Sequence, residues 1–267
     1  MRHPAVADRF YPGSSRTLSQ AMQELLPQSS LAARQPALAV AVPHAGYVYS
    51  GSLAGETLAR VVVPETVLLI GPNHRGQGSA VALSGDSWMM PFGPVPCNEE
   101  LCRDLTARSR HFRVDESAHR YEHSLEVQLP FLQMLQKRLR IVPLVLSQIS
   151  YPLCEELATA IAQAIEAHDG EVLIVASTDM NHYDSRENTE KKDRMALRCI
   201  ELFNPYELYH TVRDNRISMC GVIGVVIAML VARKMGGGTA TLVGYTDSGH
   251  ISGDTAQVVG YAGVIIN

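Results

Sequence analysis

Histidines that follow strand-like segments are the strongest candidates for chemistry in this sequence. Four of the ten histidines, His44, His74, His182 and His250, each come after an apolar run typical of a β-strand. Parallel strands end at one edge of a sheet, so we expect these imidazoles to converge there, with Asp179 among them. Neutral imidazoles are ligands for Fe(II), Zn(II) or Cu. The pattern therefore predicts a mononuclear metal site with a spare acid/base group.

The stretch Thr66–Gly76 carries most of this prediction. Five of its first six residues are β-branched or leucine, and His74 follows the closing turn. A continuous apolar run closed by turn residues is typical of a strand buried on both faces. Ala37–Val42 ends in the same way before His44, and Ser50–Val63 has the composition of a crossover helix. We therefore expect a βαβ unit whose two strands are parallel neighbours.

The remaining apolar runs extend this α/β pattern. Further strands are predicted at Ser79–Leu83, Ile141–Leu146, Glu171–Ser177, Thr239–Thr246 and Gln257–Ile266. Helices are predicted at Ser15–Leu26, Glu122–Leu139, Tyr151–His168, Arg186–Phe203, Pro205–Asp214 and Gly221–Met235, and Gly85–Pro96 is predicted to be a loop. Pro130 should kink or split its helix. Without a repeat or linker to divide it, the chain is predicted to be one α/β domain over residues 1–267, with a mostly parallel central sheet flanked by helices.

Composition and charge exclude several classes of function. The 267 residues are 46% hydrophobic and 19% charged, which is a globular composition with enough apolar material for a core. The net charge of −4 and the scattered Lys and Arg residues argue against a nucleic-acid partner. The N-terminus lacks the apolar core of a signal peptide, and Cys220–Ala232 is shorter than the roughly 20 apolar residues that span a bilayer. We therefore expect a soluble, cytoplasmic protein without membrane contact.

The number and spacing of the cysteines argue against two kinds of structural site. The five cysteines are odd in number and contain no C-x-x-C pair, which argues against a disulfide framework and a zinc knuckle. We expect small buried thiols, with Cys220 set apart because it precedes a predicted helix start.

The sequence also lacks a P-loop, a G-x-G-x-x-G after a strand and a G-x-S-x-G elbow. Nucleotide binding and serine hydrolysis are therefore disfavoured.

A competing zinc-peptidase interpretation comes from His119 and His123. The run from His119 to His123 fits H-x-x-E-H, in which two imidazoles on one helix face bind zinc and Glu122 is the general base. This interpretation needs a further carboxylate ligand downstream and leaves the histidines at the strand ends unexplained. A plainer role for the segment 122–126 is to line the pocket. The peptidase therefore stays a minor alternative.

Seven motifs, in order and spread over nearly the whole chain, resemble those of the MEMO family. They are AVADRFYPG, VPHAGYVYSG, IGPNHRG, EHSLEVQLPFLQ, STDMNHYD, CGVIG and YTDSGHISGD…VVGYAG. That family is similar in fold to the class III extradiol (LigB-type) dioxygenases, which are non-haem iron enzymes that open catechol rings. The resemblance therefore implies a LigB-like α/β fold with a divalent metal ion at the strand ends. Fe(II) is the favoured metal, with Zn or Cu as alternatives.

The resemblance also implies a ligand set. His44 and His74 match the family's two histidine ligands. The third ligand in the animal member is a cysteine in the last polar loop, where this chain reads TDSGHISGD. The nearest counterpart is His250, and Asp254 is the fallback. A histidine in place of an acid or thiol would neutralise Fe(II) less and favour Zn or Cu.

The candidate catalytic pair follows from the same resemblance. Asp179 and His182 match the family's Asp…His pair beside the metal, and His182 is the candidate acid/base. The other pocket residues expected are Tyr47, Asn73, Glu122, His123 and Cys220.

Two classes of function remain open. The first is a metal-dependent redox enzyme, and the second is a binding module that holds a metal or an anionic peptide group without turnover. The animal member is described as a signalling and cell-motility factor that binds phosphotyrosine peptide, iron or copper. Microbial members often stand beside genes for an AMMECR1-like protein and a radical SAM protein. We therefore expect these two as partners, and a small molecule or peptide as substrate.

Overall fold

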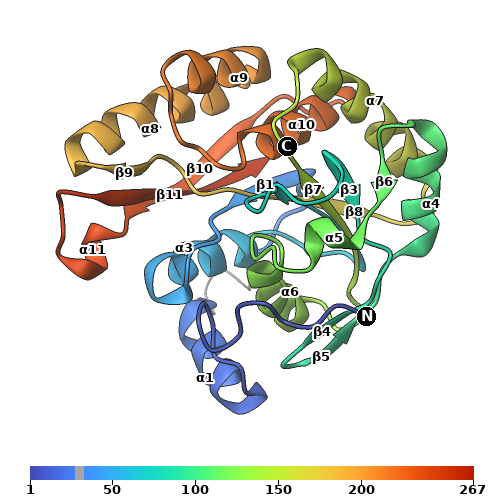
Figure 1. Cartoon of the computed structure of the whole chain (residues 1–267), viewed down its shortest axis with the longest axis horizontal. Helices are drawn as coiled ribbons and strands as arrows, with labels where there is room; N and C mark the ends of the chain where they lie inside the picture. Colours follow the sequence, from blue (N-terminus) through green and yellow to red (C-terminus); the bar gives the residue numbers. More distant parts are fainter. Residues whose placement is uncertain (28–32) are drawn as a thin grey trace.

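The computed structural model describes residues 1–27 and 33–267, and a mixed β-sheet forms its centre (Figure 1). Within these residues the sheet has nine strands in the order β10-β11-β1-β8-β2-β7-β3-β6, with β9 paired to β11. The strands are β1 (Ala39–Val42), β2 (Thr66–Pro72), β3 (Val81–Leu83), β6 (Arg113–Val114), β7 (Arg140–Leu146), β8 (Val172–Ser177), β9 (His182–Asp184), β10 (Ala240–Asp247) and β11 (Val258–Ile266).

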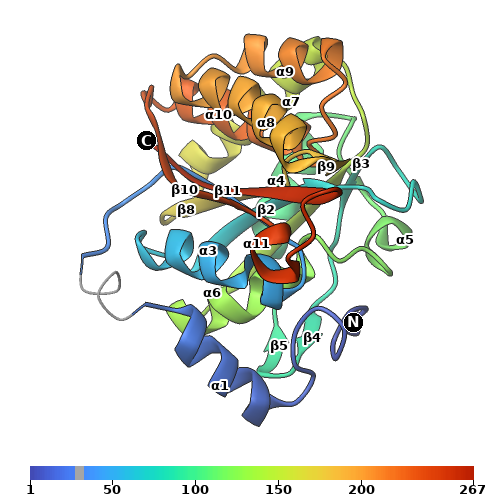
Figure 2. The same ribbon diagram turned by 90° about the vertical axis from the view of Figure 1, so that its left-hand side faces the viewer.

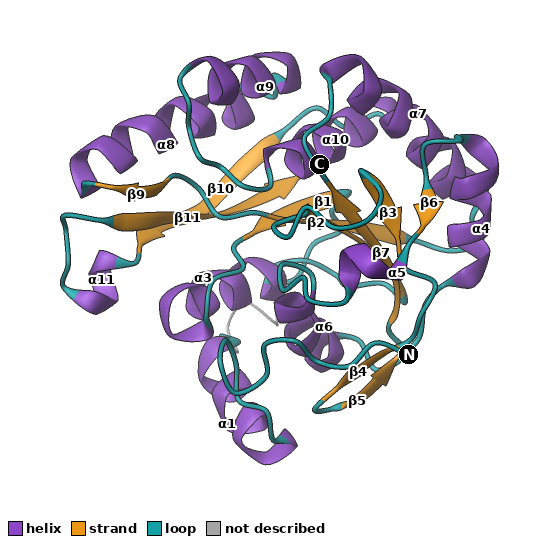
Figure 3. Cartoon of the chain, viewed as in Figure 1, coloured by secondary structure: helices purple, strands orange, loops and turns teal. Residues whose placement is uncertain are grey.

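Helices cover both faces of this sheet and give a three-layered molecule (Figures 2 and 3). One face carries α1 (Ser15–Leu25), α3 (Tyr47–Ala59) and α6 (Leu129–Leu135). The other carries α4 (Glu99–Arg108), α7 (Tyr151–Ala167), α8 (Arg186–Glu201), α9 (Pro205–Asp214) and α10 (Val222–Lys234). The short helical turns are α5 (Glu116–His119), η1 (Glu126–Gln128) and α11 (Gly249–Ser252).

Strand β2 shows why the sheet is covered on both sides. Val67 and Leu69 belong to the hydrophobic core under α1, α3 and α6, whereas Leu68 and Ile70 belong to the core under α7 and α10. Side chains alternate between the faces of a strand, so a continuous apolar run needs cover on both. Strands β1, β8, β2 and β7 are mutually parallel. The predicted fold class, a single-domain α/β protein with flanking helices, is confirmed.

The prediction that the first two strands are direct neighbours in the sheet is wrong. Strand β8 lies between β1 and β2 and pairs in parallel with both of them. A crossover helix fixes the handedness of the connection but leaves room for a later strand to enter between its two strands. The strands β1, β8 and β2 nevertheless all end at the same edge of the sheet.

Two other predicted elements differ from the structure. The segment 122–125 is not helical, and the expected helix Glu122–Leu139 is reduced to η1 and α6. Pro130 lies in the first turn of α6, where its missing N–H leaves no helical hydrogen bond unmade. The expected loop Gly85–Pro96 contains a hairpin of β4 (Trp88–Met90) and β5 (Gly93–Val95).

Among the described residues, we find no helix that combines the length and the apolar character needed to cross a membrane.

Candidate metal centre

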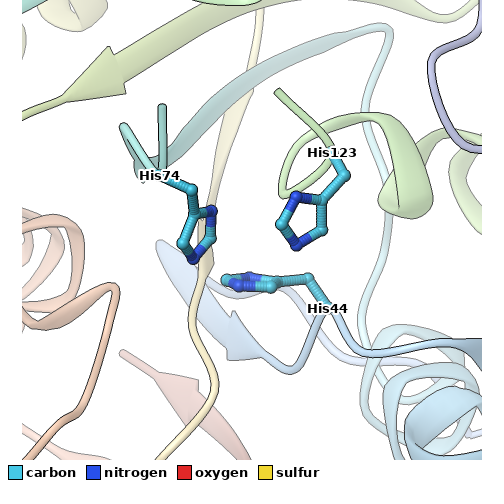
Figure 4. Close-up of side chains that lie close together, drawn as sticks. All are labelled: His44, His74 and His123. Atoms are coloured by element: carbon cyan, nitrogen blue, oxygen red, sulfur yellow. The ribbon is translucent and has the colours of Figure 1, made fainter. Parts of the chain in front are cut away.

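Three imidazoles form the candidate metal centre (Figure 4). His44 follows β1, His74 follows β2, and His123 lies in the loop between α5 and η1. Each offers one ring nitrogen, and these three nitrogens lie within 4.8 Å of one another. Two nitrogens that share one zinc ion are at most about 4.2 Å apart, because each bond is about 2.1 Å long. Small ring rotations would therefore bring all three onto one ion.

Hydrogen bonds around His44 determine which of its ring nitrogens is free. The Ser177 hydroxyl donates to the Ser124 carbonyl oxygen (2.6 Å), so it accepts a hydrogen bond from the Nδ1–H group of His44 (3.0 Å). The Nε2 atom then carries the lone pair. Burial and the neighbouring imidazoles of His123 and His74 hold the pKa of His44 well below its usual value. His44 is therefore neutral and presents Nε2 as a ligand atom.

Glu122 organises the other two imidazoles. Its carboxylate accepts from the backbone N–H of His74 (2.8 Å) and from Nδ1 of the same residue (2.9 Å). It also accepts from the backbone N–H groups of His123 and Ser124, both at 2.9 Å. Burial opposes its charge, but the hydrogen bond from His74 and the other donors lower the pKa of Glu122 to about 2. The Nε2 atom of His74 is thereby left free.

The donor set fits a metal ion. Metals bind the neutral imidazole, and burial lowers the pKa of His123 to about 4, so this ring is also neutral at pH 7. Ligand histidines usually donate their second nitrogen to a carboxylate or another polar group. Ser177 takes this role for His44, and Glu122 takes it for His74.

Cys220 and Asp179 lie near the ligand nitrogen of His44. The Sγ atom of Cys220 is 3.3 Å from Nε2 of His44, and an oxygen of Asp179 is 4.0 Å from the same nitrogen. Asp179 also accepts from the backbone N–H of His44 at 2.7 Å. Burial raises the pKa of Asp179 to about 7, and burial together with Asp179 raises the pKa of the Cys220 thiol. A thiol and a carboxyl group therefore both lie close to Nε2 of His44.

His182 is held beside the centre by Ser218. The Ser218 hydroxyl accepts from the backbone N–H of His182 (2.8 Å), and the Ser218 carbonyl oxygen accepts from Nδ1 (3.0 Å). The proton on Nδ1 leaves Nε2 free to accept another proton. Burial lowers the pKa of His182, and the neighbouring imidazole of His74 adds to that shift. In the described residues no hydrogen bond joins His182 to Asp179, whose contacts position His44 instead.

The expected third ligand, His250, does not join the cluster, and His123 takes its place. His250 is exposed on α11, which lies at the far left end of β10 and β11 in Figure 1. Strand β10 is separated from β1 by β11, or about 10 Å. Because β10 is the edge strand of the sheet, the turn that carries His250 lies apart from the ends of β1 and β2.

Three other expected pocket residues have local roles. Asp254 is exposed, and its side chain accepts from the backbone N–H of Ala256. Tyr47 is buried in the core and donates to the Val127 carbonyl oxygen at 2.6 Å. Asn73 stabilises the turn after β2 by donating to the Gln77 carbonyl oxygen at 2.7 Å.

The zinc-peptidase arrangement is not present. His119 ends α5 and is fully buried, and its Nε2 lies 3.0 Å from the Ala82 carbonyl oxygen. His123 lies beyond the end of that helix, so the two imidazoles share no helix face. The Glu122 carboxylate already accepts hydrogen bonds from the backbone and the ring of His74. The helical prediction on which this alternative depended is therefore wrong.

Sequence reasoning missed the hydroxyl groups that hold the histidines. Ser177 begins the motif STDMNHYD and Ser218 lies in none of the motifs, but neither could be assigned a role, because their partners are separated from them by 133 and 36 residues. Gln128 was missed for the same reason, and its amide donates to the Ser177 hydroxyl at 2.9 Å.

Comparison with known proteins agrees with the motif pattern. The model of the family described as "Memo-like protein" matches residues 2–265. A MEMO1 family protein of Aquifex aeolicus is 39% identical over 99% of this chain and 98% of its own length. Similar relatives from Methanobrevibacter smithii (36% identity, 98% of both chains) and Methanococcoides burtonii (38%, 100% of both chains) carry the same name. The chain therefore belongs to the Memo-like protein family.

Proposed function

We propose that the protein is a metal-dependent redox enzyme with a dioxygenase-like site. The observation that carries this proposal is the convergence of His44, His74 and His123, with the proton acceptor His182 beside them. Three protein ligands leave coordination positions for reactants, as in the facial-triad iron sites. When bound, a redox-active ion such as Fe(II) supplies the electron transfer that lets dioxygen react with an organic substrate.

The residues of the chain have separate roles in this proposal. His44, His74 and His123 would hold the ion, and Glu122 and Ser177 would keep two of these rings in orientation. Nε2 of His182 would take a proton from an acidic hydroxyl group of the substrate and return it to the product.

Fe(II) is the metal that the family resemblance favours, and Zn or Cu are the alternatives. Imidazole ligands suit all three ions, whereas a thiolate favours Zn or Cu(I). The position of Cys220, 3.3 Å from His44 Nε2, therefore makes the choice of metal an experimental question. Metal analysis of the protein purified without added metal answers it.

We further propose, on the family resemblance alone, that an AMMECR1-like protein and a radical SAM protein are its partners. Co-purification of the tagged chain with each candidate tests this proposal.

The enzymatic proposal is tested by oxygen uptake. The Fe(II)-loaded protein should consume oxygen with at least one catechol or phenolic compound, and His182→Ala should suppress this uptake while still binding metal. If the wild-type protein binds metal but consumes no oxygen with any such compound, the site is a metal-binding module without this chemistry.

A further inference from the structure

A second feature of the same sheet edge is a cavity of about 670 Å³ beside the metal centre. It lies between the segment that follows β7, helix α9, and the loop that leads into α10. These helices lie together on one side of the sheet (Figure 3). The volume falls within the roughly 300–1,000 Å³ typical of small-molecule pockets.

The wall of the cavity is largely apolar. Val212, Ile217, Met219 and Ile223 line it, and all four side chains are buried in the protein. Such a surface favours the hydrocarbon or aromatic part of a ligand.

The charged groups of the cavity are arginines. Arg213 and Arg216 line it, and none of the described residues that line it is acidic. Arg213 is already engaged, because it donates to Asp214 and to His210, both at 2.8 Å. Arg216 is exposed and forms no ion pair with any residue in the described ranges. Its guanidinium is therefore available to bind a carboxylate or phosphate with two hydrogen bonds.

Arg216 directly follows the C-cap of α9. Its φ of 50° lies in the left-handed region that commonly ends a helix, and the Ile217 backbone N–H donates to the Val212 carbonyl oxygen at 2.9 Å. Glycine and asparagine adopt this region more readily than arginine. The first residues of α10, Val222 and Ile223, also line the cavity, and the amino end of this helix adds a field that favours an anion.

The cavity adjoins the metal centre through two residues. Cys220 lines it and has its Sγ atom 3.3 Å from Nε2 of His44. Ser218 also lines it and accepts the two hydrogen bonds that hold His182. A ligand in the cavity would thus contact the residues that position a candidate metal ligand and the candidate acid/base.

We propose that this cavity is a subsite for an organic anion. Its apolar body packs on Val212, Ile217 and Ile223, its carboxylate or phosphate binds Arg216, and its other end approaches Cys220. The identification of this anion as the substrate rests on the proposed redox function, whereas its binding does not.

Direct binding measurements on the purified full chain test the subsite. Phenylacetate and phenyl phosphate are the anionic probes, and phenylacetamide is the neutral control, each titrated calorimetrically. At least one anion should bind, with the amide about tenfold weaker or more because it lacks the charge. Comparison of the two anions shows whether the site prefers a carboxylate or a phosphate.

Arg216→Asn is the decisive variant, because asparagine suits the left-handed backbone and the fold should be kept. It should weaken anion binding about tenfold or more. Arg103→Gln is the matched control, since Arg103 is an exposed arginine on α4 outside any described ion pair. Gln148→Trp, which places a bulky ring at an exposed lining position, should also reduce binding.

The outcomes separate this inference from the redox proposal. Absence of binding by both anions, or equal binding by wild type and Arg216→Asn, overturns the subsite. If the anions bind as expected but no compound supports oxygen uptake, the subsite stands and the redox function fails. If oxygen uptake occurs but neither Arg216→Asn nor Gln148→Trp affects it or the binding of the probes, the redox function stands and the subsite fails.

Discussion

The carboxylate of Glu122 holds His74 at two points, with Oε2 on its backbone N–H at 2.8 Å and Oε1 on its ring Nδ1 at 2.9 Å. The same group accepts from the backbone N–H of the neighbouring His123. A single buried carboxylate therefore links a ligand that follows β2 to a ligand from an irregular loop, 49 residues later in the chain.

Glu122→Gln should weaken both the fold and the metal site. An amide places an N–H₂ group where the carboxylate accepts N–H groups, so a buried donor faces other donors. We expect a loss of about 2–4 kcal/mol in the free energy of unfolding and about a 10- to 100-fold loss of metal affinity. Urea denaturation and metal titration measure the two effects. Glu156→Gln, at a half-exposed carboxylate on α7, should change neither by much, and an unchanged metal affinity in Glu122→Gln would contradict this role.

His182→Gln should separate proton transfer from metal binding. The backbone N–H of His182 still donates to the Ser218 hydroxyl in this variant, so the local fold should persist. We expect oxygen uptake to fall by about 10²- to 10⁴-fold while metal affinity stays within about twofold of wild type. His111→Gln is the surface control. Equal uptake by His182→Gln and wild type would remove His182 from the mechanism.

Arg2 should stabilise the loop that carries His123. Its guanidinium donates to the carbonyl oxygens of His119 (2.8 Å) and Glu122 (2.5 Å), pairs with Glu126 (2.7 Å), and lies 4.0 Å from the ring centre of Trp88. Removal of one partner of a buried ion pair costs about 3–5 kcal/mol. Arg2→Met should therefore lower the free energy of unfolding by this amount and speed hydrogen exchange in residues 119–127.

A double-variant cycle checks the Arg2–Glu126 pair. The Arg2→Met/Glu126→Gln protein should lose clearly less stability than the sum of the two single losses, because the partners share one interaction. Additive losses, or a loss below about 1 kcal/mol in Arg2→Met, would show that the N-terminal segment does not hold this loop.

Asp193 should make stability fall as the pH rises. Its carboxyl accepts from the Asn181 backbone N–H and from the Tyr245 hydroxyl, both at 2.8 Å, and burial raises its pKa to about 7. The unfolded pKa is about 3.9, so the folded state binds the proton more tightly. This contribution is fully present below pH 4 and is lost as the pH rises to about 7, at most about 4 kcal/mol in total.

Asp193→Asn removes that titration. An asparagine oriented with its oxygen on Asn181 and its N–H₂ group on Tyr245 keeps both contacts. Relative to wild type, the variant should therefore be more stable at pH 8 than at pH 5, as measured by urea denaturation at both values. A constant difference between the two proteins would show that Asp193 keeps an ordinary pKa.

The strand ends could be predicted from the sequence because the signal there is local. The apolar run in β2 and the turn after it place His74, and the similar run in β1 places His44. The entry of β8 between them could not be predicted, since it depends on a pairing formed more than 100 residues later.

The third imidazole shows the limit of the sequence pattern. The segment around His123 has apolar spacing that favours a helix, but Glu122 binds His74 and the local backbone is irregular instead. His250 follows a strand, as expected, but that strand lies at the sheet edge and extends past β1. The order of the strands in the sheet therefore decides which strand ends approach the metal centre, and this order cannot be predicted from local sequence patterns.

The most direct test of the metal centre is a titration of the metal-free protein with Co(II) or Zn(II), comparing wild type, His44→Ala, His123→Ala and His250→Ala. We expect one ion per wild-type chain, at least about a 100-fold loss of affinity without His44 or His123, and wild-type binding without His250. A protein that binds metal equally well without His123 but loses it without His250 would contradict this account.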